Sequence, residues 1–328
     1  MANEVVAFGE AMIRLTPPGR LRVEQTASFD VQVGGAELNT AAGLAQIGRS
    51  TAWVSRLTDN SLGRLVAARA RASGVVTNRI VWTAEDRVGL FFLEEGSAPR
   101  PSQIVYDRAG SAFARLVPGM IPWDEVLAGS RWFHVSGISL AVSDSAAAVT
   151  REALAAAKRA GLTVSFDPNY RSKLWPIDVA ARVFRECMRS VDVLIASEAD
   201  AIRLLDIPPG SSAEIAARLC DAYGVTTVAF TRRDGTSVTR DRFSALLFHQ
   251  GLEYSAREYD IEVVDRIGAG DAFAAGLIDG LLDSDASRAV EQATALAALK
   301  HTVPGDSLWI TRRELDELLR DGSLRVRR

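Results

Sequence analysis

The strongest chemical signal in the chain is a glycine-rich turn that ends in an aspartate. Residues 263–271 read VVDRIGAGD, so a strand-like run leads into Gly268-Ala269-Gly270 and then into a small-residue helix that contains Asp271. Main-chain N–H groups at the start of a helix bind anions, and glycines let a phosphate approach the backbone closely. An aspartate beside them can accept a hydroxyl proton while the amides stabilise charge on a moving phosphoryl group. The segment therefore indicates phosphoryl transfer, and a tight turn with Asp271 capping the helix is the structural alternative.

Other catalytic patterns are not supported by the sequence. A dinucleotide fingerprint needs a glycine where Phe273 stands, and no Gly-Lys-Ser/Thr follows the turn as in a Walker A loop. The three histidines are scattered, and no Ser-His-Asp pattern is evident, so we expect structural roles for them. They are His134, His249 and His301.

A second glycine motif lies near the amino terminus. Gly34-Gly35 precedes a helical stretch in which Asn39 faces back toward the turn. Taken alone, this motif is explained by a helix start whose asparagine makes a local hydrogen bond.

Together, the two motifs carry a resemblance. GGAxxN at residues 34–39 and DxxGAGDxF at residues 265–273 resemble the ribokinase-like (PfkB-type) sugar kinases over essentially the whole chain. Four further motifs are similar to the 2-keto-3-deoxygluconate kinases of that family: Gly9-Glu10, YDRAGSA at 106–112, DPNYRSKLW at 167–175 and PGD at 304–306. The resemblance implies a Rossmann-like α/β domain with a β lid, ATP at the carboxyl edge of the sheet, and transfer to a primary sugar hydroxyl.

The resemblance also implies roles for individual residues. Asp271 becomes the general base, and Gly268, Ala269 and Gly270 form the anion hole. The implied substrate-binding residues are Gly34, Gly35, Asn39, Phe91, Tyr106, Arg108 and Arg171. Arginine suits the carboxylate of a keto-acid because its planar guanidinium matches that group. Solvated surface pairs are the alternative for both arginines, and Phe91 replaces a tyrosine that related kinases often use to touch substrate.

On the nucleotide side the chain departs from the family pattern. An arginine pair in TRRDG at 231–235 replaces the usual Lys-Leu-Gly or Thr-Leu-Gly, and Arg233 could still neutralise a phosphate. Ala297 and Lys300 on a late helix correspond to the wall around the adenine, and amphipathic packing of that helix is the alternative for them. The implied cofactor-binding residues are Ser197, Thr231, Arg233, Gly235, Gly268, Gly270, Ala297 and Lys300.

Two cation sites follow from the same resemblance. Asp200 and Glu198 are candidate Mg²⁺ ligands, and Asp200 replaces a longer glutamate, so Mg²⁺ would be held through water. A helix capped by Ser197 with acids in its first turn explains these residues equally well. A monovalent cation near Asp265 is the second expectation.

These residues need a scaffold, and the sequence predicts an α/β one. Short apolar runs alternate with helical periods, which indicates a doubly wound, mostly parallel sheet with helices on both faces. Expected strands are 5–8, 51–55, 132–135, 162–166, 193–196 and 226–231, and expected helices are 36–47, 143–160, 179–190, 213–223 and 286–300. Segments 11–33 and 87–112 break this rhythm and predict a small β lid on one domain spanning 1–328, with strands 88–93 and 103–106 antiparallel in the second segment.

Composition restricts the remaining function classes. The 328 residues are 48% hydrophobic with a net charge of −3, which excludes a disordered chain and provides no basic field for nucleic acid. No apolar run is long enough to span a membrane, and Glu4 stands where a signal peptide needs basic residues. We expect a cytoplasmic protein with free Cys187 and Cys220 that forms homo-oligomers through the exposed edges of its lid.

The leading hypothesis is an ATP-dependent, Mg²⁺-assisted kinase that converts 2-keto-3-deoxygluconate to its 6-phosphate. Other substrates within the class are fructose, 5-dehydro-2-deoxygluconate and 2-keto-3-deoxygalactonate. A sugar-acid sensor on the same fold, without turnover, is the alternative from another class. A dehydrogenase ranks third because no dinucleotide glycine pattern is present.

Overall fold

The main body is built on one large, mostly parallel sheet. In this computed structural model, which describes residues 3–235, 237 and 239–321, nine strands belong to that sheet. In spatial order they are β14 (Leu252–Ser255), β13 (Arg240–His249), β12 (Thr227–Arg233), β11 (Val193–Ala196), β10 (Thr163–Asp167), β9 (Trp132–Ser136), β1 (Val5–Phe8) and β4 (Thr51–Val54), with β15 (Tyr259–Glu262) paired to β13. Neighbours from β12 to β4 run parallel, whereas β13 pairs antiparallel with its three neighbours.

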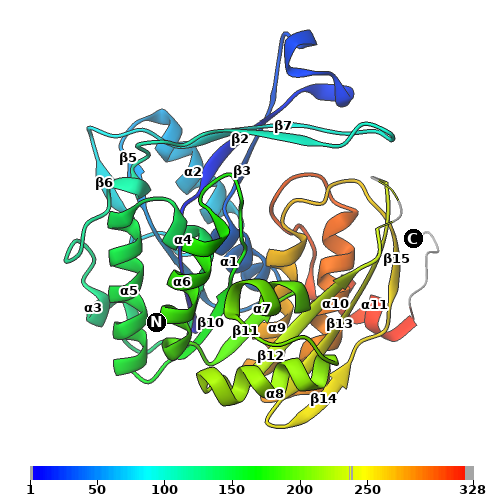
Figure 1. Ribbon diagram of the computed structural model, residues 1–328. Coiled ribbons are helices and arrows are strands. Elements are labelled where there is room, and N and C mark those ends of the chain that lie inside the picture. Colours follow the sequence, from blue (N-terminus) through cyan, green and yellow to red (C-terminus); the bar gives the residue numbers. More distant parts are fainter. Residues whose placement is uncertain (1–2, 236, 238, 322–328) are drawn as a thin grey trace.

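Helices cover both faces of this sheet (Figure 1). Their bounds are α1 (Ala36–Gln46), α2 (Ser61–Ala72), α3 (Trp123–Leu127), α4 (Gly137–Ala141), α5 (Asp144–Arg159), α6 (Ile177–Cys187), α7 (Glu198–Leu205), α8 (Ser212–Tyr223), α9 (Ala269–Leu282), α10 (Ala286–His301) and α11 (Arg312–Asp321). Short 3-10 turns span 18–20, 23–25, 113–115 and 188–190. None of the described helices is both long enough and apolar enough to cross a membrane.

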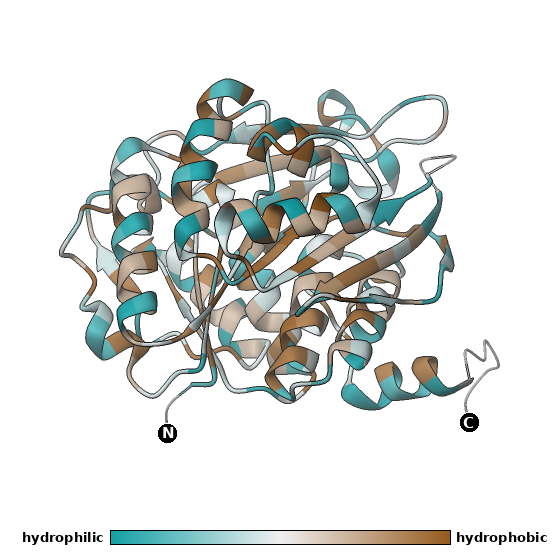
Figure 2. Ribbon diagram, turned by 60° about the horizontal axis from the view of Figure 1, so that its bottom comes forward, coloured by the Kyte–Doolittle hydropathy of each residue, from teal (hydrophilic) through white to brown (hydrophobic). Residues whose placement is uncertain are grey.

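Each face of the sheet has its own hydrophobic core. Successive side chains of a strand point to opposite faces, so Val6 and Phe8 pack with helices α3 to α8 while Val5 packs with α9 and α10. Apolar strands in the middle and polar outer helix faces are visible in Figure 2. The predicted doubly wound, mostly parallel sheet with helices on both faces is confirmed.

A second sheet stands over the carboxyl edge of the first, at the top of Figure 1. Its strands come from the two irregular segments, in the order β3 (Asp30–Gly34), β2 (Met12–Thr16), β7 (Leu90–Glu94) and β8 (Gln103–Asp107). We call this four-stranded sheet the lid. The antiparallel pairing of β7 with β8 matches the two strands expected there. A short parallel pair, β5 (Arg56–Thr58) and β6 (Val81–Thr83), completes the described strands.

Candidate active site

A cavity of about 490 Å³ lies between the lid and the carboxyl ends of the parallel strands. It is the place where a doubly wound sheet is expected to bind ligands. Most of the residues singled out from the sequence line it. They are Gly34, Gly35, Asn39, Phe91, Tyr106, Arg108, Arg171, Ser197, Asp200, Thr231, Arg233, Gly268, Gly270 and Asp271.

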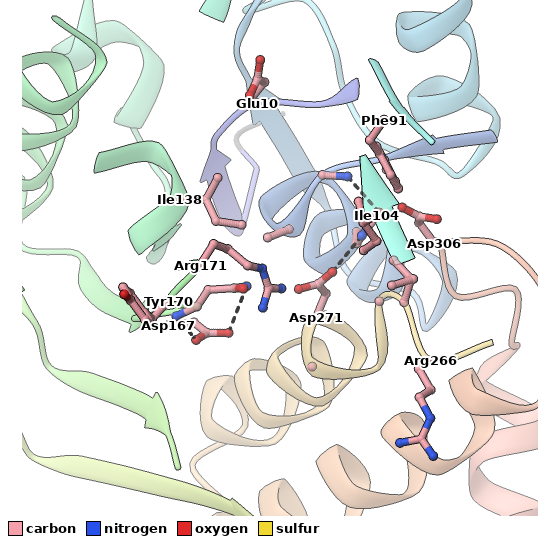
Figure 3. Close-up of a pocket in the computed structure, with 18 of the residues that line it drawn as sticks. Glu10, Phe91, Ile104, Ile138, Asp167, Tyr170, Arg171, Arg266, Asp271 and Asp306 are labelled. Carbon is pink, nitrogen blue, oxygen red and sulfur yellow. Dashed lines mark hydrogen bonds between the residues drawn. The ribbon is translucent and has the colours of Figure 1, made fainter. Parts of the chain in front are cut away.

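Asp271 lies in the first turn of α9, at the bottom of this cavity (Figure 3). Its side chain is nearly buried, with 8% exposure. Asn39 of α1 donates a hydrogen bond of 2.7 Å from Nδ2 to Oδ2 of Asp271. Burial raises the pKa of Asp271 to about 6, against the lowering effects of the Asn39 hydrogen bond and the Arg171 charge. The carboxylate is therefore ionised at neutral pH and close to the pKa range that suits a general base.

The turn before Asp271 leaves main-chain groups open to the cavity. Gly268 caps α9 with φ of 85°, and a Cβ there would lie 1.9 Å from the main-chain oxygen of Asp306, so only glycine fits. No side chain among the described residues caps the first amides of α9, so Asp271 is not the helix cap. A Cβ at Gly270 would meet nothing within 4 Å. The start of α9 can therefore accept an anion.

The amino-terminal glycine motif meets the same place from the other side. A Cβ on Gly34 would lie 1.7 Å from Oδ2 of Asp306. The absence of a side chain at Gly34 therefore lets the end of β3 pack closely against the loop after α10. Asn39 Oδ1 also accepts a long hydrogen bond of 3.5 Å from the Gly35 N–H. Asn39 thus makes the local bond of the structural alternative and, with its other atom, the bond to Asp271.

Arg171 brings positive charge to the cavity from the loop after β10. Its guanidinium points toward Asp271 (Figure 3) and is exposed. It attracts both Asp271 and Asp167. Burial raises the pKa of Asp167 to about 7, and the negative charge of Asp271 adds to this rise. The cavity thus holds two acids whose protonation is coupled, with one arginine between them.

The lid contributes aromatic and charged side chains. Phe91 and Tyr106 lie on neighbouring strands with ring centroids 6.0 Å apart. Arg108 stands 5.7 Å from the Tyr106 ring centroid and forms a buried ion pair with Glu10, which also accepts a hydrogen bond from Ser111. Because Glu10 already pairs with Arg108, the exposed Arg171 is the more accessible positive group in the cavity.

The expected nucleotide residues divide into two groups. The cavity is lined by Ser197, Thr231, Arg233, Gly268 and Gly270, and Arg233 lies 5.6 Å from the Phe243 ring centroid. Gly235, Ala297 and Lys300 are not among the lining residues, and neither is Ala269 of the expected anion hole. Ala269, Ala297 and Lys300 are fully buried, because they lie inside α9 and α10, which are packed against each other. The Lys300 ammonium donates instead to the main-chain oxygen of Val303 at 3.0 Å.

The two candidate Mg²⁺ ligands face different surroundings. Asp200 lines the cavity and accepts a hydrogen bond of 2.7 Å from the Ser197 hydroxyl, which itself caps α7. Glu198 forms an ion pair of 2.7 Å with Arg232 outside the cavity and is occupied there. No three His, Cys, Asp or Glu side chains gather as metal ligands in the described part of the chain. Of these two candidates, Asp200 is the one that fits Mg²⁺, which keeps several waters and takes other ligands from substrate phosphates.

The expected monovalent cation near Asp265 does not fit its surroundings. Oδ2 of Asp265 lies 2.8 Å from Nη1 of Arg14, a fully buried arginine of β2. The carboxylate also accepts main-chain hydrogen bonds from Ile267 and Gly305, each 2.9 Å long. Its oxygens are thus already used by the protein itself.

Sequence reasoning missed five charged residues around the site. Asp167, Glu10, Asp306 and Arg266 line the cavity, and Arg14 lies behind it. The first four belong to motifs named above, so their position after a strand or in a turn was the available signal. Arg14 gave none, because it is an arginine in an apolar strand whose partners are more than two hundred residues away.

Comparison with known proteins agrees with this geometry. Residues 2–311 match the family model described as pfkB family carbohydrate kinase. The chain is 36% identical to a 2-dehydro-3-deoxygalactonokinase from Haloferax volcanii over 100% of both chains. It is 31% identical to a 2-dehydro-3-deoxygluconokinase from Thermoproteus tenax, covering 96% of this chain and 94% of the relative. The crystal structure of a 2-dehydro-3-deoxygluconokinase from Thermotoga maritima is similar with a TM-score of 0.94 and 41% identity, covering 97% and 98% of the two chains.

Proposed function

The chain belongs to the pfkB family of carbohydrate kinases, and we propose that it phosphorylates the terminal hydroxyl of 2-keto-3-deoxygluconate to give the 6-phosphate. The observation that carries this proposal is the buried Asp271 carboxylate, held by Asn39 beside the open start of α9. Sugar and ATP are the small-molecule substrates that the family implies.

Asp271 accepts the proton of the terminal hydroxyl, and the oxygen then attacks the γ-phosphoryl group in line. The Gly268 and Gly270 amides stabilise the negative charge that spreads over the transferred phosphoryl oxygens, whereas the Ala269 N–H donates to the main-chain oxygen of Arg266. Asn39 orients the carboxylate through its 2.7 Å hydrogen bond. Asp200 is the residue that would hold Mg²⁺ through water, and the ion would supply positive charge to the nucleotide phosphates.

The acid character of the substrate is supported by Arg171. Its guanidinium is exposed in the cavity, so a substrate carboxylate can form an ion pair with it. With a neutral sugar such as fructose, Arg171 keeps only the protein's own carboxylates, Asp167 and Asp271, as charge partners. Between the two sugar-acid epimers, the relative named 2-dehydro-3-deoxygalactonokinase keeps 2-keto-3-deoxygalactonate as the second candidate.

Steady-state kinetics on a substrate panel test the proposal. The panel contains 2-keto-3-deoxygluconate, 2-keto-3-deoxygalactonate, 5-dehydro-2-deoxygluconate and fructose, each with ATP and Mg²⁺. We expect kcat/KM for a keto-acid to exceed that for fructose by about tenfold or more. A preference for fructose contradicts the substrate assignment, and binding of a keto-acid without ATP consumption favours a sensor.

We further propose that the lid pairs with a second copy of the chain. β3 and β8 are its edge strands, and each presents an exposed valine: Val31 with 45% and Val105 with 59% exposure. Unpaired strand edges with apolar side chains favour association. Light scattering during size-exclusion chromatography measures the mass, and a strictly monomeric species at working concentration contradicts the pairing.

A further inference from the structure

Four buried charged side chains form a cluster behind the anion-binding turn. Two are cations, Arg14 from the lid strand β2 and Lys300 from α10. Two are carboxylates, Asp265 before the turn and Asp306 in the loop after α10. Their exposures are 1% for Arg14, 0% for Lys300, 5% for Asp265 and 3% for Asp306.

Arg14 joins the two carboxylates. Its Nη1 lies 2.8 Å from Oδ2 of Asp265 and 2.7 Å from Oδ1 of Asp306. Asp265 in turn accepts hydrogen bonds from the main chain on both sides, from Ile267 in its own loop and from Gly305 in the neighbouring loop. One buried guanidinium therefore links the lid, the 265–268 loop and the 302–306 loop.

Lys300 lies between the same two loops. Its ammonium donates to the main-chain oxygen of Val303 at 3.0 Å, and Asp265 and Asp306 both attract it. Its Cε would lie 3.3 Å from a Cβ on Gly268, so the side chain supports the anion turn from behind. A carbonyl oxygen and two nearby carboxylates are the surroundings that a bound alkali cation would also need.

The charges of the cluster balance within the protein. The two buried cations face the two buried carboxylates, and the partly exposed Glu95 adds a third carboxylate, 3.7 Å from Nη2 of Arg14. Charges removed from water require such partners. An added K⁺ at this place would have to compete with a tethered ammonium and a guanidinium for the same oxygens. The expected monovalent cation therefore does not fit here, because Lys300 and Arg14 already supply the positive charge that these oxygens need.

We propose that Lys300 and Arg14 are the built-in cations of this site, positioning residues that hold the Gly268–Gly270 turn so that phosphoryl transfer requires no monovalent ion. The activity part of this inference rests on the proposed function. Its binding part, that the folded chain has no K⁺ site here, stands independently.

The unaltered protein provides the first test. Turnover and melting temperature are measured in potassium chloride, sodium chloride and tetramethylammonium chloride at equal ionic strength. We expect turnover to agree within about twofold in the three salts, with no K⁺-specific rise in melting temperature. A K⁺-specific activation of about fivefold or more, or a K⁺-specific stabilisation, overturns the proposal.

Two substitutions at the lysine make the test sharper. Lys300→Ala removes the ammonium and leaves space facing the Val303 oxygen, whereas Lys300→Met removes the charge but keeps the space filled. In tetramethylammonium chloride we expect kcat of both variants to fall about tenfold or more, with KM for the sugar acid changed by less than about threefold. K⁺ or NH₄⁺ should restore turnover and raise the melting temperature of Lys300→Ala only.

Arg49→Met is the matched control. Arg49 forms a similar partly buried pair with Asp279 at 2.6 Å, and neither residue lines the cavity. This variant should melt at a lower temperature without any K⁺ response. Unchanged turnover of Lys300→Ala, or a loss that K⁺ and NH₄⁺ do not repair, overturns the proposal. If no sugar acid is phosphorylated, the proposed function fails, and the melting temperatures still decide the cation question.

Discussion

Asn39 Nδ2 lies 2.7 Å from Oδ2 of Asp271, although 232 positions separate the two residues in the sequence. The first turns of α1 and α9 therefore meet at one point beneath the lid. The hydroxyl of Thr40 adds a second link, a hydrogen bond of 3.3 Å to the main-chain oxygen of Asp271. Because a donated hydrogen bond stabilises the ionised carboxylate, α1 controls both the direction and the charge of the proposed base.

Asp271→Asn should abolish most turnover and keep nucleotide affinity. The amide cannot accept the hydroxyl proton, whereas the Gly268–Gly270 backbone is unchanged. We expect kcat to fall by about 10²–10⁴-fold. Calorimetric titration with a non-hydrolysable ATP analogue measures the affinity. Wild-type kcat in the variant would remove Asp271 from the role of base.

The same substitution should stabilise the fold at neutral pH. Burial raises the pKa of Asp271 from 3.8 to about 6, so the folded state favours the protonated acid. Below pH 3.8, Asp271 is protonated in both the folded and the unfolded state. As the pH rises toward 6, Asp271 ionises first in the unfolded state, so the free energy of unfolding falls, and above pH 6 this loss is complete. Relieving it is worth up to about 3 kcal/mol. Thermal unfolding should show a higher melting temperature for Asp271→Asn at pH 7.5 and a smaller difference at pH 4.5; a lower melting temperature at pH 7.5 contradicts this account.

Asn39→Leu should shift the acid limb of the pH–rate profile to higher pH. The wild-type limb in kcat/KM is expected near pH 6, where Asp271 loses its proton, with Asp167 titrating near 7 in the same cavity. Removing the hydrogen bond raises the pKa of Asp271, so activity should appear at higher pH.

Thr40→Val is the control for that shift. The Thr40 hydroxyl contacts main-chain oxygens of Ala36 and Asp271 and not the carboxylate. Its removal should leave the limb in place while lowering stability. Equal shifts in Asn39→Leu and Thr40→Val would show that the profile reports general loosening of the site.

Regular elements of the main sheet were predictable because their sequence pattern is local. The run Val193–Ala196 is apolar throughout, as a strand buried on both faces must be, and β11 has those bounds. The helix expected at 286–300 is α10 with one more residue. The antiparallel strands β13 to β15 were missed, because RDRFSALLFH alternates polar and apolar residues only in part.

A site residue was predictable only where its own type and its neighbours in the sequence indicate the role. A glycine turn before Asp271 is visible in sequence, since backbone conformation requires glycine there. The environment of Lys300 is not, because a lysine on an amphipathic helix is usually solvated, and its burial depends on Asp265 and Asp306. Glu198 shows the reverse: its sequence position suits a metal ligand, and a tertiary contact with Arg232 occupies it.

Arg171→Gln should weaken binding of the acid substrate and spare binding of ATP. The exposed guanidinium of Arg171 is an accessible partner for a carboxylate in the cavity, and loss of a charged hydrogen bond is worth about 1.5–3 kcal/mol. KM for 2-keto-3-deoxygluconate should therefore rise about ten- to a hundredfold, while KM for fructose and ATP changes little.

The Arg171→Gln assays belong at pH 8, because removing the Arg171 charge also raises the pKa of Asp271. Arg232→Gln is the matched control, since Arg232 is also exposed yet pairs with Glu198 outside the cavity. Equal losses for keto-acid and fructose in Arg171→Gln would mean that this arginine does not recognise the carboxylate.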